Sequence, residues 1–171
     1  MPDLQISAPT GLPQVVTSTT LDAPRTLVFR AFTDPALLAA WFGPDDLTIT
    51  IDRFEARDGG RWRIVHTDAE GRQYAVHGVY HGHPTPESTV RTSEFEGAPG
   101  HVMLERLELE EQDGRTFLRS TSLFQTFHHR DAMVESGMGQ GIRASFERLE
   151  RLLEWLQRTG SEEAPPAGRA A

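Results

Sequence analysis

The chain has 171 residues, a formal net charge of −8 at pH 7 and no cysteine. The lack of cysteine excludes disulfides, thiolate nucleophiles and Cys-ligated zinc, and the acidic balance argues against binding of nucleic acid or anionic membranes. No apolar run approaches the roughly 20 residues of a membrane span, and residues 1–14 lack the regions of a secretory signal. We therefore expect a cytoplasmic protein without membrane insertion.

One domain is predicted between two tails. Residues 1–13 are rich in Pro, Ser, Thr and Gly, and residues 159–171 show no periodic apolar pattern, so both ends are interpreted as flexible. Hydrophobic residues make up 37% of the chain, and with its 15 glycines this suffices for a core. A single domain is expected over residues 14–158.

The domain begins with a strand and two short helices. Residues 15–21 are rich in β-branched side chains, which favours a strand. Asp22-Ala23-Pro24 predicts a helix start. Asp34, followed by Pro35, can cap a second short helix, which ends at Gly43-Pro44.

Strands and one long helix make up the rest. Six strands are predicted at residues 47–54, 60–67, 73–82, 89–95, 102–111 and 116–124. The tight turns between them favour an antiparallel meander. One apolar helix face is then predicted at Ile142, Phe146, Leu149, Leu153 and Leu156. The expected class is α+β, with a sheet of about six to seven strands whose one face the long helix covers.

Several stretches, in this order, resemble a known superfamily. They are FTDPALLAAWFGP (32–44), DGGRWR (58–63), EGRQYAVHGVYHGHPTPE (70–87), EFEGAPGH (94–101), EEQDGRT (110–116) and FQTFHHRDAMVESGMGQGIRASFERLERLLE (124–154). The chain is similar to START-like, or SRPBCC, domains, and within them to bacterial homologues of the activator of heat shock protein 90 ATPase. The resemblance implies the helix-grip fold of the birch-pollen-allergen type: a curved antiparallel sheet around a long C-terminal helix, with a cavity between them.

Apolar side chains are expected to converge between sheet and helix. They are either an ordinary core or the walls of a ligand cavity, and ligand pockets are mostly apolar with a few polar groups. The predicted ligand-binding residues are Trp41, Phe42, Trp62, Ile64, His66, Tyr74, Val76, Tyr80, Glu105, Phe124, Met138, Ile142 and Phe146.

Two of these residues are candidates for chemistry. Glu105, if it faces inward, is an isolated carboxylate beside apolar walls that can pair with a ligand or with His66. The alternatives are a solvated Glu105 at the cavity mouth and a hydrogen-bonded core histidine at position 66. No metal site is expected, because strand alternation places His77, His81 and His83 on the outward face.

The glycine-rich stretch SGMGQGI precedes the long helix. It lacks the strand–loop–helix context and the Lys-Ser/Thr ending of a phosphate loop. We interpret it as a hinge or a close helix–sheet contact, with residues 128–141 acting as a lid over the cavity. On the same helix, Leu152 and Trp155 are expected on an exposed face that can support a homodimer.

Three functions are consistent with these features. The leading hypothesis is a carrier or sensor for a small hydrophobic or aromatic molecule, with no cofactor. The second is an aromatase/cyclase- or hydratase-type enzyme with His66 or Glu105 as general base. The third, implied by the resemblance, is a co-chaperone-like module that contacts a heat shock ATPase.

Overall fold

The computed structural model describes residues 3–166, which form one antiparallel sheet and four helices. The strands are β1 (Gln5–Ser7), β2 (Gln14–Leu21), β3 (Thr48–Phe54), β4 (Arg61–Thr67), β5 (Gln73–Val79), β6 (Ser88–Phe95), β7 (Val102–Gln112) and β8 (Arg115–Leu123). The helices are α1 (Arg25–Thr33), α2 (Pro35–Trp41), α3 (Phe127–Glu135) and α4 (Met138–Thr159). The strand order is β1-β2-β8-β7-β6-β5-β4-β3.

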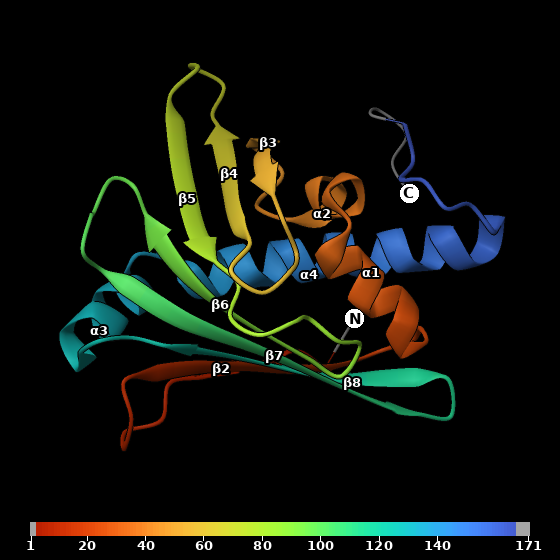
Figure 1. Ribbon diagram of the computed structural model, residues 1–171, viewed down its shortest axis with the longest axis horizontal. Coiled ribbons are helices and arrows are strands. Elements are labelled where there is room, and N and C mark those ends of the chain that lie inside the picture. The colour runs from red at the N-terminus through yellow and green to blue at the C-terminus, as the bar shows by residue number, and fades with distance from the viewer. Residues whose placement is uncertain (1–2, 167–171) are drawn as a thin grey trace.

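The sheet curves around α4, and α1 and α2 lie between β2 and β3 in the chain (Figure 1). This arrangement confirms the helix-grip prediction, with eight strands instead of six to seven. The additional strand is β1, which lies in the segment predicted as a flexible tail. That part of the prediction is wrong, because β1 pairs with β2 and the preceding Leu4 is buried in the core.

Local sequence signals account for most helix boundaries. The Asp34 carboxylate accepts hydrogen bonds from the backbone N–H groups of Ala36 (2.9 Å) and Leu37 (3.4 Å), so it caps α2 as predicted. Helix α4 begins after Gly137 and ends before Gly160, and both glycines have positive φ. Helix α3 was not predicted as a separate element; the Thr126 side chain caps it by accepting from His129 N (3.1 Å).

The sheet bends sharply between β5 and β6. Only Val76↔Phe95 and His77↔Glu94 pair across these two strands. Nearer the bend, the Thr92 hydroxyl bridges the gap by accepting from Val79 N (3.2 Å) and donating to Val79 O (3.4 Å). A Cβ atom at Gly78 would lie 1.8 Å from Thr92 O, so only glycine allows this approach of the two strands.

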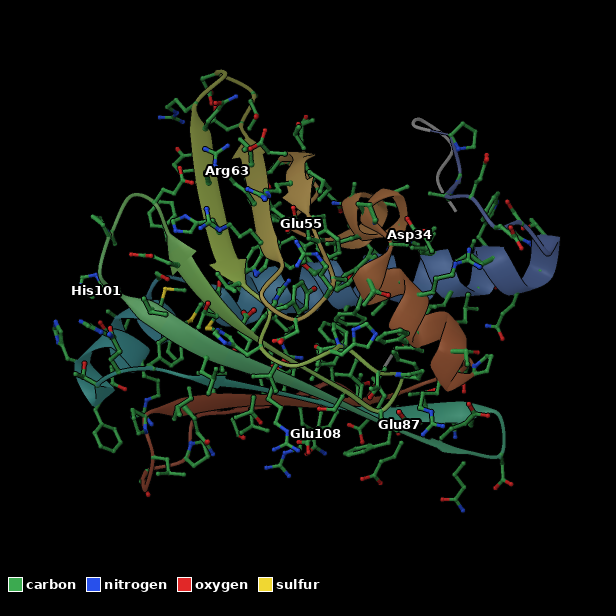
Figure 2. The ribbon with its side chains drawn as sticks, in the orientation of Figure 1. Asp34, Glu55, Arg63, Glu87, His101 and Glu108 are labelled. Atoms are coloured by element: carbon green, nitrogen blue, oxygen red, sulfur yellow. The ribbon has the colours of Figure 1, made fainter. Side chains whose placement is uncertain are left out.

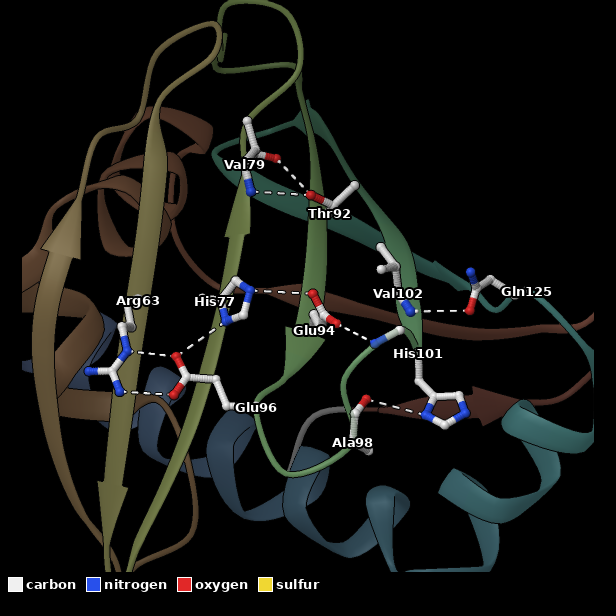
Figure 3. Close-up of polar contacts among 11 residues, drawn as sticks. Arg63, His77, Val79, Thr92, Glu94, Glu96, Ala98, His101, Val102 and Gln125 are labelled. Carbon is white, nitrogen blue, oxygen red and sulfur yellow. Dashed lines mark hydrogen bonds and ion pairs between the residues drawn. The ribbon is translucent and has the colours of Figure 1, made fainter.

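A polar network crosses the same junction on the outer face of the sheet (Figure 3). Arg63 donates two hydrogen bonds to Glu96, and the two ring nitrogens of His77 lie near the carboxylates of Glu94 (3.3 Å) and Glu96 (3.2 Å). Hydrogen bonding to Arg63 is the main reason why the pKa of Glu96 lies below its ordinary value. Side chains therefore connect strands whose backbone ladder is short.

The second half of α4 is part of the hydrophobic core. Leu149, Leu153 and Leu156 belong to the same buried cluster as Leu109 and Leu118 of the sheet. Leu152 is also buried, so the expectation of an exposed Leu152–Trp155 face is wrong for Leu152, and Trp155 is partly buried against the same core. These two residues therefore do not form the exposed apolar face on which the expectation of a homodimer was based.

The prediction of a flexible C-terminal tail is wrong for the described part of that segment. Ala164 packs against the core, and Arg30 donates to the backbone carbonyl of Glu162, so residues up to 166 follow the body of the domain. Residues 167–171 lie outside the described residues. Within residues 3–166, each helix is too short or too polar to cross a lipid bilayer.

Candidate functional site

A cavity of about 300 Å³ lies between the concave face of the sheet and the first half of α4. An engineered apolar cavity of about 150 Å³ holds benzene, and small-molecule sites span about 300–1,000 Å³. Its lining residues are Thr17, Phe32, Thr33, Trp41, Phe42, Gly43, Pro44, His66, Tyr80, Thr89, Arg91, Glu105, Arg106, Leu107, Ser120, Ser122, Met138, Gly141, Ile142, Ser145 and Phe146. The hollow can therefore hold a molecule somewhat larger than one aromatic ring.

Aromatic side chains from the helices form one wall, which we call the roof: Phe32, Trp41, Phe42 and Phe146. The Trp41 ring centroid lies 4.7 Å from that of Phe32 and 6.3 Å from that of Phe146. The indole N–H of Trp41 donates to Ala31 O (2.9 Å), so the ring is held in place and its polar atom is satisfied.

The roof is tied to α4 by hydrogen bonds behind the end of α2. Ser145 Oγ accepts from Gly43 N (3.0 Å), and the guanidinium of Arg148 donates to Ala40 O and Gly43 O (both 3.1 Å). These bonds satisfy carbonyl groups that the end of α2 leaves without helical partners. They also fix how the end of α2 lies against α4.

The opposite wall, the floor, is the inward face of β2, β8, β7 and β6. Strand register places its residues in two cross-strand rows. The first row is Val15, Ser122, Glu105 and Arg91, with Tyr80 next to Arg91 through an isolated bridge. The second row is Thr17, Ser120, Leu107 and Thr89. Hydroxyl and charged groups therefore face the aromatic roof.

An ion pair lies on the part of the floor formed by β6 and β7. Arg91 Nε donates to Glu105 Oε2 (2.8 Å), and the side chains are only 16% and 24% exposed. The Arg91 guanidinium also stacks 4.2 Å from the centroid of the Trp62 ring. Burial acts to lower the pKa of Arg91, but the carboxylate of Glu105 and the Tyr80 side chain outweigh it, so the pKa lies above its ordinary value. Arg91 is therefore charged in the folded protein.

His66 contributes an imidazole at the roof side of the cavity. Its ring centroid lies 5.7 Å from that of Phe42, and within the described residues Nε2 is buried without a hydrogen-bond partner. Burial lowers the pKa of His66, so the neutral form is favoured at pH 7. Burial also raises the pKa of the Tyr80 phenol.

The structure brings together eight of the thirteen predicted residues. These are Trp41, Phe42, His66, Tyr80, Glu105, Met138, Ile142 and Phe146. Glu105 faces inward beside Leu107 and Leu109, and its partner is Arg91 rather than His66.

The other five predicted residues lie elsewhere. Trp62 is covered by Arg91, and Ile64 and Val76 pair with each other in the core. Tyr74 has the predicted strand face but is 39% exposed near the end of the β4–β5 hairpin. Alternation along a strand predicts the face of a side chain, not its distance from the cavity.

Phe124 is the fifth, and it lines a different hollow. This second pocket, of about 330 Å³, lies under α3 and is lined by Phe95, Ala98, His101, Val102, Met103, Phe124, Gln125, His128, His129, Ala132 and Met133. Strand β8 ends at Leu123, and the backbone N–H of Phe124 donates to Pro13 O (2.8 Å), so the chain has already left the floor at this residue.

Arg91 is the principal site residue that the sequence did not reveal. Its signal would have been the β6–β7 hairpin register, which places Arg91 directly opposite Glu105. That register depends on the conformation of residues 96–101, which the sequence pattern does not determine. The hydroxyls of Thr17, Ser120 and Ser122 were missed for the same reason, because each lies inward only through its strand pairing.

The proposed lid consists of α3 and the start of α4. Met138 and Gly141 line the cavity. Arg130 of α3 donates to the carbonyls of Pro9 (2.6 Å) and Leu12 (3.2 Å), so the segment is anchored to the N-terminal residues. The alternative of a close helix–sheet contact is not supported at Gly141, where a Cβ atom would meet nothing within 4 Å.

The three outward histidines differ in their surroundings. His77 pairs with glutamates on the outer face, and His81 and His83 are exposed. Among residues 3–166, no three potential ligand side chains are grouped closely enough to hold a metal ion.

The fold and the position of the cavity are those of a helix-grip domain of the SRPBCC type. The family model described as "Activator of Hsp90 ATPase homolog 1-like protein" matches residues 22–154, and the chain belongs to this family. No curated protein matches the chain.

Solved structures agree with this assignment. A Rhodobacter sphaeroides protein is 25% identical, with a TM-score of 0.81 over 90% of this chain and 99% of the other. An Arthrobacter aurescens protein is 21% identical, with a TM-score of 0.81 and 98% of both chains covered. The AHSA1 protein of Silicibacter pomeroyi is 20% identical, with a TM-score of 0.69 over 83% of this chain and 98% of the other. The last two show likeness of fold alone.

Proposed function

We propose that the chain binds a small, mainly apolar or aromatic molecule in the cavity between its sheet and α4, as a carrier or sensor. The observation that supports this most is a hollow of about 300 Å³ where a core of the usual packing density leaves only small voids. The hollow combines an aromatic roof with a few polar groups, which is the usual composition of a ligand site.

The test is direct detection of a bound molecule. Native mass spectrometry of the purified chain is expected to show a co-purified species or, after its removal, a complex with 1-naphthol. Naphthol at 100 times its Kd should stabilise the folded state by about 2.7 kcal/mol, because it binds that state preferentially. Absence of any adduct, together with no thermal shift for naphthol or naphthalene, would contradict the proposal.

A catalytic role is the second candidate, and His66 is the observation that favours it. Within residues 3–166, His66 Nε2 is buried without a protein partner, and a neutral imidazole of this kind is suited to act as a general base toward a bound substrate. If the chain turns over a cyclisable or hydratable substrate, His66→Ala should lower kcat by about 10²–10⁴-fold while Glu110→Ala, at an exposed position, leaves it unchanged. Unchanged turnover in His66→Ala and Glu105→Ala would exclude both residues as bases.

Contact with an Hsp90-type ATPase is a separate proposal that rests on the description of the family. It predicts that the purified chain raises the ATPase rate of such a chaperone. An unchanged ATPase rate at saturating concentrations of the chain would contradict this proposal.

A further inference from the structure

The floor of the cavity contains a pair of opposite charges that is neutral as a unit. Arg91 and Glu105 are directly opposed across β6 and β7 and joined by the 2.8 Å bond from Nε to Oε2. Among residues 3–166, Glu105 Oε1 accepts no hydrogen bond from a protein donor. The pair therefore offers a ligand a free acceptor oxygen beside a guanidinium, which has five N–H donors in all.

Among the described residues that line the cavity, only Arg106 adds a further lasting charge. The remaining polar groups of the floor are the hydroxyls of Thr17, Thr89, Ser120 and Ser122, and the imidazole of His66 is mainly neutral. Arg106 is the exception among the lining residues, but its guanidinium pairs with Glu108 at 3.1 Å on the exposed face. An additional charge on the ligand would thus be desolvated without an unmatched opposite charge to receive it.

We propose that the ligand of this cavity is a neutral molecule with an apolar ring body and a hydroxyl, or a similar group that both donates and accepts, seated on the Arg91–Glu105 pair. This inference rests on the proposed binding function and adds the class of ligand to it. The ligand hydroxyl donates to Glu105 Oε1 and accepts from Arg91, while its rings lie against the roof formed by Phe32, Trp41, Phe42 and Phe146. A hydrogen bond to a charged partner is roughly twice as strong as one between neutral groups, so the pair recognises a hydroxyl strongly without a net charge.

The inference is tested with four compounds that share one ring system. Equilibrium dialysis at pH 7 compares 1-naphthol with naphthalene, 1-naphthoate and 1-naphthylmethylammonium. Naphthol is expected to bind about tenfold more tightly than each of the other three, because only naphthol is neutral and carries a donor and an acceptor.

Two variants separate the pair from the rest of the wall. Glu105→Gln leaves the Arg91 charge unmatched, so naphthoate should gain about tenfold in affinity and become the preferred compound. The double variant Arg91→Met/Glu105→Leu removes both charges together, which buried ion pairs generally tolerate, and should bind naphthol and naphthalene equally. Glu110→Gln is the control and should keep the wild-type ranking. It is an exposed glutamate of β7 two residues beyond Glu108, whose side chain points away from α4 (Figure 2).

The outcomes distinguish this inference from the proposed function. Binding of none of the four compounds to the wild type would overturn both. Binding of naphthalene or naphthoate at least as tightly as naphthol, or an unchanged ranking in the folded double variant, would overturn the inference alone.

Discussion

The two halves of α4 face the same sheet, but the second half belongs to the packed core and the first half borders the cavity. The second half presents Leu149, Leu152, Leu153 and Leu156, all at most 3% exposed, and these side chains belong to the same hydrophobic core as the leucines of β7 and β8. The first half presents Gly141 and Ser145 beside Met138, Ile142 and Phe146, and here the space to the sheet is hollow.

The sheet changes character at the same point. In the packed core, Leu109 and Leu118 pair across β7 and β8, and one step along the same strands Leu107 pairs with Ser120. The next step pairs Glu105 with Ser122. Two residues of translation along β7 and β8 thus turn a packed core into a polar floor. The cavity exists because small or polar residues line the gap both on the first half of α4 and on β7 and β8.

The largest expected contrast is in the stability lost when a side chain of α4 is shortened to alanine. Leu149→Ala should lower the free energy of unfolding by about 2–5 kcal/mol, because a fully buried leucine leaves a cavity when shortened. Ile142→Ala, which borders existing empty space, should cost about 1 kcal/mol. Urea denaturation monitored by circular dichroism measures both, and equal losses would mean that the first half of α4 packs as tightly as the second.

The packed half was also the more predictable half. The spacing of Ile142 to Leu156 predicted α4, and Asp34-Pro35 predicted α2, because each signal is local in sequence. Strand β1 was missed because three residues beside Pro and Gly carry too little pattern, and its stability comes from pairing with β2 and from burial of Leu4.

The cavity was predictable only where it depends on the face of an element. Trp41, Phe42, Ile142 and Phe146 were placed correctly because helical periodicity and the helix-grip resemblance orient them. Arg91 was missed because its role depends on the register of a hairpin, which is a tertiary property. Phe124 was misplaced because the residue at which β8 leaves the sheet is fixed by contacts with Pro13 and α3, not by its own sequence.

The second contrast concerns opening of the structure at the two ends of α4. The segment 128–141 is mostly exposed, and Gly137 with its positive φ separates α3 from α4. Its amides are expected to exchange hydrogen at least about tenfold faster than those of 149–156, since local opening is easiest where few apolar contacts must be broken. Hydrogen exchange followed by mass spectrometry provides the comparison. Equal protection of the two segments would contradict the proposal that residues 128–141 act as a lid.

The third prediction concerns a substitution that fills the cavity with a leucine like those of the packed core. Ser120→Leu repeats in the second cross-strand row the leucine pairing seen between Leu109 and Leu118. It should leave the free energy of unfolding within about 1 kcal/mol of wild type and abolish naphthol binding. Arg119→Leu, on the exposed face one residue earlier, is the matched control and should bind naphthol normally. Normal binding in the folded Ser120→Leu protein would place the ligand elsewhere.

The smallest expected effect is the pH dependence that His66, on the cavity wall, adds to the free energy of unfolding. Burial lowers the pKa of His66 below its ordinary 6.5, so the unfolded chain takes up a proton at a higher pH than the folded one. The stability from this residue is therefore complete above pH 6.5 and is lost as the pH falls through the lower, folded-state pKa, with a slope of at most about 1.4 kcal/mol per pH unit. In urea titrations between pH 8 and pH 5, His66→Phe should lose less stability than wild type. His81→Phe, at an exposed position, controls for the removal of a histidine. Identical slopes in His66→Phe and wild type would mean that the imidazole is solvated, and the cavity wall would then be open to water at His66.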